Sequence, residues 1–280
     1  MSEPIATPFV ELGLEPDGHI TLEANSSGVA IVRLNRPERR NAFDEVTIRA
    51  LTGAFETLHA ADTVRVVFLR GAGGTFSAGA DLDWMRRAAD ATADANRADA
   101  MDLARMLKAL HDLRMLTVAL VEGAAFGGGA GLVAACDMAV ATADARFAFS
   151  EARMGLTPAT ISPYVVRAIG ARNARRLFAQ ARVFDAGEAL RIGMVDQVVA
   201  DAAALEDAAV RIGADLLGVA PGAMADSKTL VDEIDGHHID HRLMTDTARR
   251  IAERRASAEG REGVAAFLAR RRPSWAETAD

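Results

Sequence analysis

Cysteine and long apolar runs are the features that this 280-residue sequence most clearly lacks. Its single cysteine, Cys136, has no partner for a disulfide within the chain, which favours a reducing compartment such as the cytoplasm. No apolar run approaches the roughly 18 residues that a membrane helix requires. Residues 1–16 hold no basic segment followed by an apolar one, so no export signal is predicted. We therefore expect a cytoplasmic protein without a membrane segment.

Positive charge is also in short supply. The chain carries 39 acidic and 32 basic side chains, which leaves a formal net charge of −7. Because nucleic-acid binding requires a net basic face, no nucleic-acid partner is expected. The hydrophobic share of 50% and the charged share of 25% are ordinary for a globular domain. A chain of this length can bury one large core, or a core with an appendage.

Apolar residues recur with two different periods along the chain. Alternation of apolar and polar residues over 20–24 and 29–34, around a Ser-Ser-Gly turn, predicts a β-hairpin. Short apolar runs and helical spacing predict strands at 64–69, 118–121, 138–141, 146–149 and 194–199, and helices at 43–59, 98–113 and 128–135. Strands that alternate with helices indicate an α/β core built through crossover connections.

The pattern changes near Asp201, after which only helices are predicted. They occupy residues 203–217, 222–234, 240–256 and 262–271. The predicted organisation is a loose leader over 1–17, an α/β core over 18–200 and a helical C-terminal region over 201–280. Alanine-rich amphipathic helices at a chain end often pack on a partner subunit, and packing on their own core is the alternative.

Residues 71–82 form the first segment with the composition of a ligand-binding loop. Glycines and other small residues follow a predicted strand, so the backbone can approach a ligand closely. An exposed N–H group at Ala78 could donate to a ligand oxygen. The alternative is an ordinary strand-to-helix connection in which Asp81 caps the helix.

A second glycine-rich segment, residues 123–131, lies between a predicted strand and a predicted helix. Unpaired amides at a helix N-terminus, reinforced by the helix dipole, suit an anion or a developing oxyanion. Residues 129–134 also fit a dinucleotide-binding fingerprint, with Glu151 about twenty residues further on. That fingerprint needs its glycines directly after the strand, whereas Gly123 to Gly128 come first here. The dinucleotide interpretation is therefore disfavoured.

Glu151 directly follows a predicted apolar strand and precedes the turn residues Gly155 and Pro158. Desolvation at such a position raises the pKa of a carboxyl group towards neutral pH, which makes it a useful general acid or base. The alternative is a helix-capping residue or a surface ion pair with Arg153.

The remaining polar groups favour structural roles. The histidines within residues 237–241 have metal-like spacing, but they fall in the helical region far from either glycine-rich segment, so no metal site is predicted. Cys136 lies in an apolar stretch and is expected in the core rather than as a nucleophile. The arginine runs at 39–40 and 270–272 could meet phosphates, but solvated charge is the simpler interpretation.

Taken together, the motifs resemble those of the enoyl-CoA hydratase/isomerase, or crotonase, superfamily in type and in order. They are Leu34-Asn35-Arg36-Pro37 with Asn41-Ala42, Phe76-Ser77-Ala78-Gly79-Ala80-Asp81-Leu82, Gly123 to Gly131 with Cys136-Asp137, Ser150-Glu151 with Gly155-Leu156, and Glu262-Gly263 to Phe267. The resemblance covers roughly residues 20–272. So many motifs in one order argue against an accidental match.

This resemblance implies a spiral of repeated ββα units with a helical C-terminal region that assembles trimers or hexamers. It also implies that the substrate is an acyl-CoA thioester, so that coenzyme A is part of the substrate and no separate cofactor is expected. Arg270 matches a position at which some relatives place a basic residue near a neighbouring subunit's coenzyme.

The same resemblance assigns roles to the two glycine-rich segments. The N–H groups of Ala78 and Gly128 would form an oxyanion hole for the thioester carbonyl. Gly79, Ala80 and Asp81 would help to line the pocket for the adenine and pantetheine arm. Hydration of an enoyl thioester, or a shift of its double bond, places negative charge on the thioester oxygen. Each preorganised amide that donates to this oxygen stabilises the transition state by about 3 kcal/mol.

One position departs from the family pattern. Hydratases of this family typically carry two glutamates; the first falls here on Gly131, while the second is present as Glu151. The arrangement in which a water is held between two carboxylates is therefore absent. A double-bond isomerase needs only one base and competes with a hydratase. A catalytically idle member that only binds acyl-CoA is the third hypothesis, and the presence of Glu151 beside both loops argues against it.

The segment after Ser150 is similar to that of bacterial hydratases that act on 3-methylglutaconyl-CoA and on isoprenoid-tailed relatives. The run Ile161-Ser162-Pro163-Tyr164 and the glycines of 127–131 carry this similarity. Gly131 also frees the volume of a glutamate side chain, and we expect that space to admit a branched acyl group or an extra water. The sequence predicts a hydratase for a short or branched 2-enoyl-CoA with Glu151 as its main acid and base.

Overall fold

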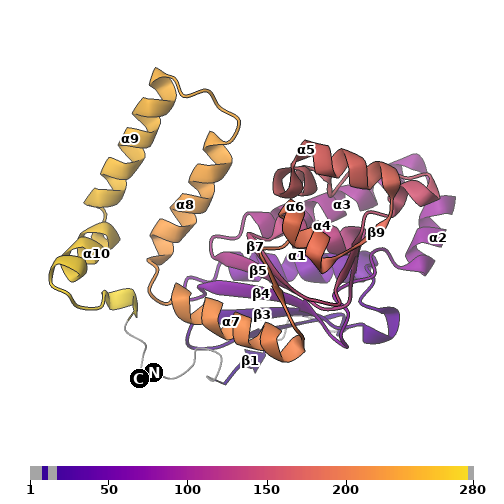
Figure 1. Cartoon of the computed structure of the whole chain (residues 1–280), viewed down its shortest axis with the longest axis horizontal. Coiled ribbons are helices and arrows are strands. Elements are labelled where there is room, and N and C mark those ends of the chain that lie inside the picture. The colour runs from indigo at the N-terminus through magenta and orange to yellow at the C-terminus, as the bar shows by residue number, and fades with distance from the viewer. Residues whose placement is uncertain (1–7, 12–17, 277–280) are drawn as a thin grey trace.

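A seven-stranded sheet forms the centre of the protein (Figure 1). The structure is a computed structural model, and it describes residues 8–11 and 18–276. The strands are β1 Val10–Glu11, β2 Ile20–Ala24, β3 Val29–Leu34, β4 Val66–Gly71, β5 Leu116–Val121, β7 Met138–Thr142 and β10 Gln197–Val199. They lie in the order β1-β2-β3-β4-β5-β7-β10. Pairing is antiparallel from β1 to β3 and parallel from β3 onwards.

Helices cover both faces of this sheet (Figure 1). One face carries α1 Glu45–His59, α3 Ala93–His111 and α4 Gly128–Ala135, and the other carries α7 Ala202–Leu216. In β4, Val67 and Leu69 pack towards the first group, while Val66 and Phe68 pack towards α7. A parallel strand buried on both faces needs apolar residues at successive positions, which explains the continuous apolar run there.

A smaller sheet places the second glycine-rich segment beside Glu151. Its strands are β6 Ala124–Phe126, β8 Arg146–Ala148 and β9 Val183–Asp185, in that order. β6 ends just before α4, and β8 ends just before the 3-10 helix η2, Glu151–Met154. Because β6 and β8 pair in parallel, the start of α4 and Glu151 leave the sheet at the same edge.

Capping side chains set where several helices begin. Asp44 accepts a hydrogen bond from the Thr47 N–H at the start of α1, and Asp81 accepts from two N–H groups at the start of α2, Leu82–Asp90. Such a cap stabilises a helix by about 1 kcal/mol. The remaining helices of the core are α5 Ser162–Gln180, which is interrupted at Gly170 with φ 73°, and α6 Ala186–Ile192.

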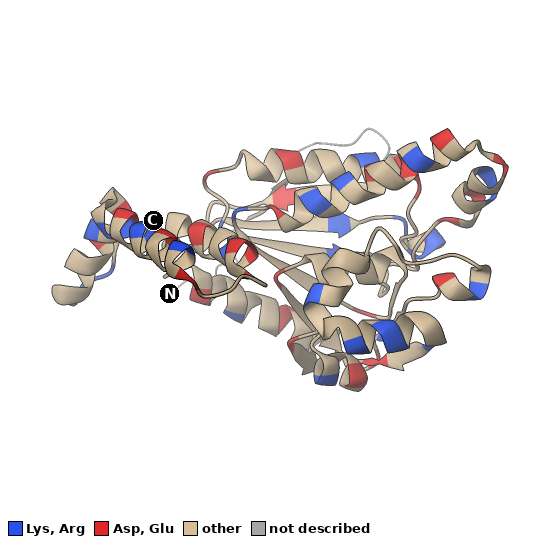
Figure 2. Ribbon diagram, turned by 90° about the horizontal axis from the view of Figure 1, so that it is seen from above, with Lys and Arg blue, Asp and Glu red and all other residues tan. Residues whose placement is uncertain are grey.

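Three helices after α7 extend away from the sheet and are called the arm (Figures 1 and 2). They are α8 Pro221–Ile234, α9 His241–Ala256 and α10 Ala258–Leu268, followed by a short 3-10 helix, Ser274–Ala276. Neither α8 nor α9 contains a buried residue. Lys228 ties α8 to the core, because its ammonium donates to the carbonyl oxygens of Leu113 and Met115 and to the Asp137 carboxylate at 2.6–2.8 Å.

Most predicted elements are confirmed within a few residues at each end. The hairpin over 20–34 forms β2 and β3, and the predicted helix at 43–59 begins two residues later at Glu45 because Asp44 caps it. The predicted helix at 98–113 begins earlier, at Ala93. The sequence analysis considered α2 only as the helix that Asp81 might cap, and it missed α5, α6, β6 and β9. Within the predicted leader, Val10 and Glu11 form β1, and residues 1–7 and 12–17 lie outside the described part of the chain.

No single helix in the described residues has both the length and the apolar content to cross a membrane. The helices α7 and α8 pass the same test only as a pair, and that pair is bent by 105°.

Candidate active site

The loop after β4 is bound to β6, the strand that leads into α4. The Ser77 N–H donates to the Ala124 carbonyl at 2.8 Å, and the Phe126 N–H donates to the Ser77 carbonyl at 2.9 Å. The Ser77 hydroxyl also donates to the Asn41 carbonyl at 2.8 Å. The first glycine-rich segment is thus fixed against the second, although more than forty residues separate them in the sequence.

The expectation of an unpaired amide at Ala78 is wrong. Its N–H donates to the Arg40 carbonyl at 2.9 Å, so it is not available to a ligand. The unpaired amide is two residues further on, at Ala80. Its neighbours Gly79 and Asp81 pair with Phe43 through their carbonyl and N–H groups, each at 2.7 Å. The Ala80 N–H has no partner among residues 8–11 and 18–276, and Ala80 is exposed.

Gly128 supplies the second unpaired amide, as expected. It is the first residue of α4, and its N–H has no hydrogen-bond partner within the described part of the chain. The preceding residue, Gly127, has φ 50° and donates its own N–H to the Ala148 carbonyl at 2.8 Å. The first amides of a helix carry partial positive charge from the helix dipole, which favours a negatively charged oxygen at this position.

Glycines allow the two loops to touch. A Cβ atom at Gly79, where φ is 93°, would lie 2.9 Å from the Phe126 carbonyl oxygen. A Cβ atom at Gly129 would lie 2.8 Å from the Ser77 carbonyl oxygen. Since real Cβ atoms do not approach backbone oxygens so closely, both positions require glycine. This packing places the loop that carries the Ala80 amide against the residues that precede and begin α4.

The Glu151 carboxyl group lies against the start of α4. Its Oε1 atom is 3.3 Å from the position that a Cβ atom would take at Gly127. Its Oε2 atom is buried and has no hydrogen-bond partner among the described residues. Burial raises the pKa of Glu151 above its ordinary value, because the charged form loses its hydration. The predicted acid/base candidate therefore lies beside the Gly128 amide.

The alternative roles considered for Glu151 do not account for its side chain. Arg153 does not pair with it, because the Arg153 guanidinium donates to the Ala181 carbonyl at 2.6 Å. Glu151 begins η2, but the cap of that helix, Ser150, makes no side-chain hydrogen bond to it. A buried carboxyl oxygen without a hydrogen-bond partner, combined with a raised pKa, is a feature of catalytic acids and bases.

Gly131 is in contact with Ile161, and the expectation that it leaves free space is wrong. A Cβ atom at Gly131 would lie 2.2 Å from Ile161 Cγ2 and 2.8 Å from Ile161 Cβ. Ile161 is 1% exposed, so its side chain fills the volume that a glutamate at position 131 would need. Neither a branched acyl group nor an extra water can enter there without displacing Ile161.

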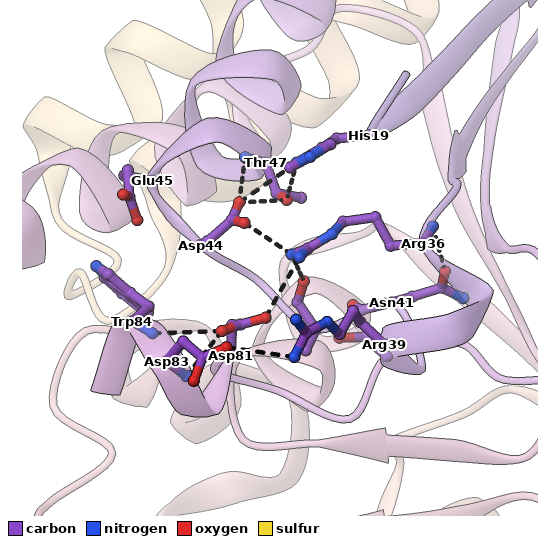
Figure 3. Close-up of polar contacts among 12 residues, drawn as sticks. His19, Arg36, Arg39, Asn41, Asp44, Glu45, Thr47, Asp81, Asp83 and Trp84 are labelled. Carbon is purple, nitrogen blue, oxygen red and sulfur yellow. Dashed lines mark hydrogen bonds and ion pairs between the residues drawn. The ribbon is translucent and has the colours of Figure 1, made fainter. Parts of the chain in front are cut away.

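Asp81 contributes to the site through the structure of the loop. Its carboxylate accepts from the N–H groups of Asp83 and Trp84 and pairs with Arg36 at 3.3 Å (Figure 3). It is 5% exposed, so its side chain is committed to these contacts. The helix-cap alternative considered for Asp81 is therefore confirmed.

Other groups that the sequence singled out lie elsewhere. Cys136 is partly buried and packs against the edge of the core, and burial of its thiol raises the pKa of that group. The described residues hold no group of three His, Cys, Asp or Glu side chains arranged to bind a metal. Arg270 follows α10 at the end of the arm, away from the two loops of the same chain (Figure 1).

The sequence analysis placed Ala80 in the pocket lining and Ile161 in the run similar to branched-chain hydratases, but it missed the unpaired amide of Ala80 and the contact of Ile161 with Gly131. Ala78 and Ala80 are equivalent by composition, and only the pairing of Gly79 and Asp81 with Phe43 distinguishes their amides. Ile161 lies thirty residues after Gly131, and no local pattern links the two positions.

Comparisons with known proteins place the chain in one family. A model of the enoyl-CoA hydratase/isomerase family matches residues 24–278. The chain is 33% identical over 254 residues to a putative enoyl-CoA hydratase of Thermus thermophilus, with 91% of this chain and 100% of the relative covered. It is 34% identical over 185 residues to the ethylmalonyl-CoA decarboxylase of Bos taurus, which covers 66% of this chain and 60% of the relative. The crystal structure of an enoyl-CoA hydratase from Shewanella pealeana matches with a TM-score of 0.89 and 40% identity, over 94% of this chain and 97% of that one.

The contact between Gly131 and Ile161 predicts a loss of stability when a side chain is added. Gly131→Ala should lower the free energy of unfolding by about 1–3 kcal/mol, because the new methyl group overlaps Ile161. Gly53→Ala on α1 is the matched control, since a Cβ atom there meets nothing within 4 Å. Chemical denaturation of both variants measures the difference, and equal stabilities would contradict the contact. Adding Ile161→Ala to Gly131→Ala should destabilise by less than the sum of the two single changes.

The buried carboxyl group predicts a pH-dependent stability. Because the pKa of Glu151 is raised in the folded protein, its contribution to stability is fully present below the unfolded pKa and is lost as the pH rises through the folded pKa. Glu151→Gln should therefore raise the melting temperature at neutral pH and have little effect near pH 4. Glu56→Gln, at an exposed position of α1, is the control. Thermal scans across this range test the prediction, and a Glu151→Gln effect that grows towards acid pH would refute it.

Proposed function

The chain belongs to the enoyl-CoA hydratase/isomerase family and has the crotonase fold, and from this we propose that it hydrates the double bond of a 2-enoyl-CoA thioester. One observation carries the proposal. Glu151, whose buried Oε2 has no partner among the described residues, lies against Gly127 beside the unpaired Gly128 amide, and the loop that carries the unpaired Ala80 amide packs on the same segment. Coenzyme A enters as part of the substrate, and the proposed reaction needs no further cofactor.

The two amides act on the thioester carbonyl. When water adds to C3 of the enoyl group, electrons move through the double bond and the thioester oxygen becomes an enolate oxygen. The N–H groups of Ala80 and Gly128 donate to that oxygen and stabilise its charge. Loss of one such donor in other enzymes slows turnover by about 10²–10³-fold.

Glu151 performs both proton transfers in this proposal. Its carboxylate takes a proton from the water as the water oxygen bonds to C3. The resulting carboxylic acid then delivers this proton to C2, so the elements of water are added and Glu151 returns to its carboxylate form. The raised pKa of Glu151 supports this role, because acid and base forms are both accessible when the pKa lies closer to the working pH.

We further propose a short or branched acyl chain of the 3-methylglutaconyl type. The run Ile161-Ser162-Pro163-Tyr164 supports this choice by its similarity to hydratases for such substrates. The volume of Gly131 does not support it, because Ile161 fills that space. The preference for branched substrates therefore rests on the sequence similarity alone.

A double-bond isomerase is the second candidate. Ile161 occupies the space of a second carboxylate, so water cannot be held between two acids at this site. An isomerase uses one base to remove a proton from C2 of a 3-enoyl-CoA and to return it to C4. The same amides would stabilise the dienolate that forms in between.

A panel of thioesters tests the proposed function. The protein should remove the ultraviolet absorbance of a conjugated 2-enoyl-CoA as water adds, and turn over 3-methylglutaconyl-CoA faster than crotonyl-CoA or long straight chains. A gain of conjugation from a 3-enoyl-CoA would identify an isomerase instead. Carbon dioxide release from ethylmalonyl-CoA would place the chain with its decarboxylase relative. Binding without turnover of any of these would identify an idle acyl-CoA-binding protein.

Glu151→Gln is the control for the chemistry within this panel. It keeps the size of the side chain and removes its proton transfer. Turnover of the best substrate should fall by about a hundredfold or more, the usual scale of general acid–base catalysis, while acyl-CoA affinity stays nearly unchanged. Turnover close to that of the unchanged protein would remove Glu151 from the mechanism.

We propose that the active form is a cytoplasmic homotrimer or homohexamer in which the arm packs on other copies of the chain. The exposed apolar side chains of the arm support this, since exposed apolar surface of this extent marks an interface. They include Ile239, Met244, Ile251, Val264, Phe267 and Leu268. Light scattering should give three or six times the chain mass of 29.6 kDa. A monomer at micromolar concentration would exclude this assembly.

A further inference from the structure

Arg36 joins Asp44 and Asp81, which flank the bridge that holds the Ala80 amide (Figure 3). It precedes a short 3-10 helix, η1 Pro37–Arg39. One guanidinium nitrogen lies 2.8 Å from the Asp44 carboxylate and donates to the Ala42 carbonyl at 3.0 Å. The other donates to the Asp81 carboxylate at 3.3 Å. The side chains of Arg36, Asp44 and Asp81 are only 13%, 13% and 7% exposed.

The two carboxylates directly follow the two residues of a backbone bridge. Phe43 and Ala80 form that bridge, and Asp44 and Asp81 come next along their segments. Asp44 caps α1, and Asp81 caps α2. Arg36 therefore connects the starts of two helices across the bridge that fixes the direction of the Ala80 N–H.

The backbone of Arg36 is itself held in place. Its N–H donates to the Asn41 side-chain oxygen at 2.9 Å. Asn41 is 1% exposed and has φ 55°, a conformation that few residues other than glycine adopt without support. Its amide nitrogen donates to the carbonyls of Ala72 and Thr75 at 2.9 and 2.6 Å. The loop before η1 and the loop after β4 thus share one set of hydrogen bonds.

We propose that Arg36 is a positioning residue that fixes the direction of the Ala80 N–H through Asp81 and Asp44. This inference rests on the proposed function, in which Ala80 donates to the thioester oxygen. Two carboxylates in a largely buried space repel each other and lose hydration, and a guanidinium between them offsets both effects. Without it, at least one carboxylate turns to solvent or takes a proton, and the Phe43–Ala80 bridge loses its lateral support.

The charge of Asp44 is consistent with this arrangement. Burial alone would raise the pKa of Asp44, but the hydrogen bonds from Thr47 and the positive charge of Arg36 lower it overall. A lysine cannot replace Arg36 fully, because an ammonium group is a single point charge whereas a guanidinium spans two partners in a fixed plane.

A chromophoric thioester separates positioning from simple stabilisation of the fold. Cinnamoyl-CoA is suitable, because conjugation with its ring disfavours hydration and keeps the bound probe intact. Hydrogen bonds to its carbonyl oxygen draw electron density along the conjugated chain and shift its absorbance to longer wavelength. The unchanged protein should produce this red shift on binding, and its complete absence would overturn the proposed oxyanion hole and this inference with it.

Arg36→Met should reduce the red shift and lower kcat by about tenfold to a hundredfold, the scale of a misplacement near 1 Å, with a smaller change in KM. Arg36→Lys should recover part of both, since it can still pair with one carboxylate. Arg87→Met is the matched control, because Arg87 joins α2 to Glu45 of α1 through an exposed ion pair at 2.7 Å. Exposed pairs contribute little to stability, so this variant should keep the full red shift and kcat.

Asp81→Asn provides a second variant if Arg36→Met does not fold. The asparagine retains an oxygen to cap α2 but loses the charge that pairs with Arg36. Like Arg36→Met, it should reduce both the red shift and kcat. A full red shift and unchanged kcat in folded Arg36→Met, or in Asp81→Asn, would overturn the positioning role while leaving the proposed function in place.

Discussion

Close contact between the loop after β4 and the start of α4 is the constraint on which the rest of the site depends. The contact is possible because Gly79 and Gly129 present no side chain to the backbone oxygens of Phe126 and Ser77. Each glycine carries an entropic penalty of about 0.5–1 kcal/mol relative to alanine in a regular element. Alanine at either position would cost more, because its Cβ atom would overlap a backbone oxygen. Glycine therefore allows the two segments to pack together beside Glu151.

The Glu151 carboxyl group lies in surroundings that disfavour its charged form. Glu151 has a buried oxygen without a partner in the described residues, and the burial that destabilises its charge also raises its pKa, as the proposed acid/base role requires. Ile161 fills the volume in which a second acid would stand, so no neighbouring carboxylate shares the proton. If Glu151 is the acid and base, as proposed, the burial that would serve the reaction also lowers the stability of the ionised protein.

Much of this arrangement could be predicted from the sequence, and the parts that could not share a physical cause. The strands β4 and β5, the helix α4 and the choice of Glu151 as the acid/base candidate all follow from local periodicity and from the order of the motifs. The identity of the unpaired amide does not, because Ala78 and Ala80 differ only in which distant carbonyl or N–H lies opposite. Nor does the role of Ile161, since a filled volume is decided by two elements that meet only in the folded chain. A glycine-rich composition indicates that a loop approaches another segment closely. Only the tertiary packing determines which segment that is and which amides stay unpaired.

The pairings that build the site join segments remote from one another in the sequence. Phe43 pairs with Ala80, Ser77 with Ala125, and β6 with β8. Each pairing closes a long loop, and the chain loses conformational entropy before the contacts of that pairing compensate for it. No one of the three pairings forms the site alone. Opening of Phe43–Ala80 or Ser77–Ala125 would loosen the first glycine-rich segment, and opening of β6–β8 would loosen the contact between α4 and Glu151. Local opening can cost less free energy than global unfolding, so a folded molecule can lose this arrangement while its core stays intact.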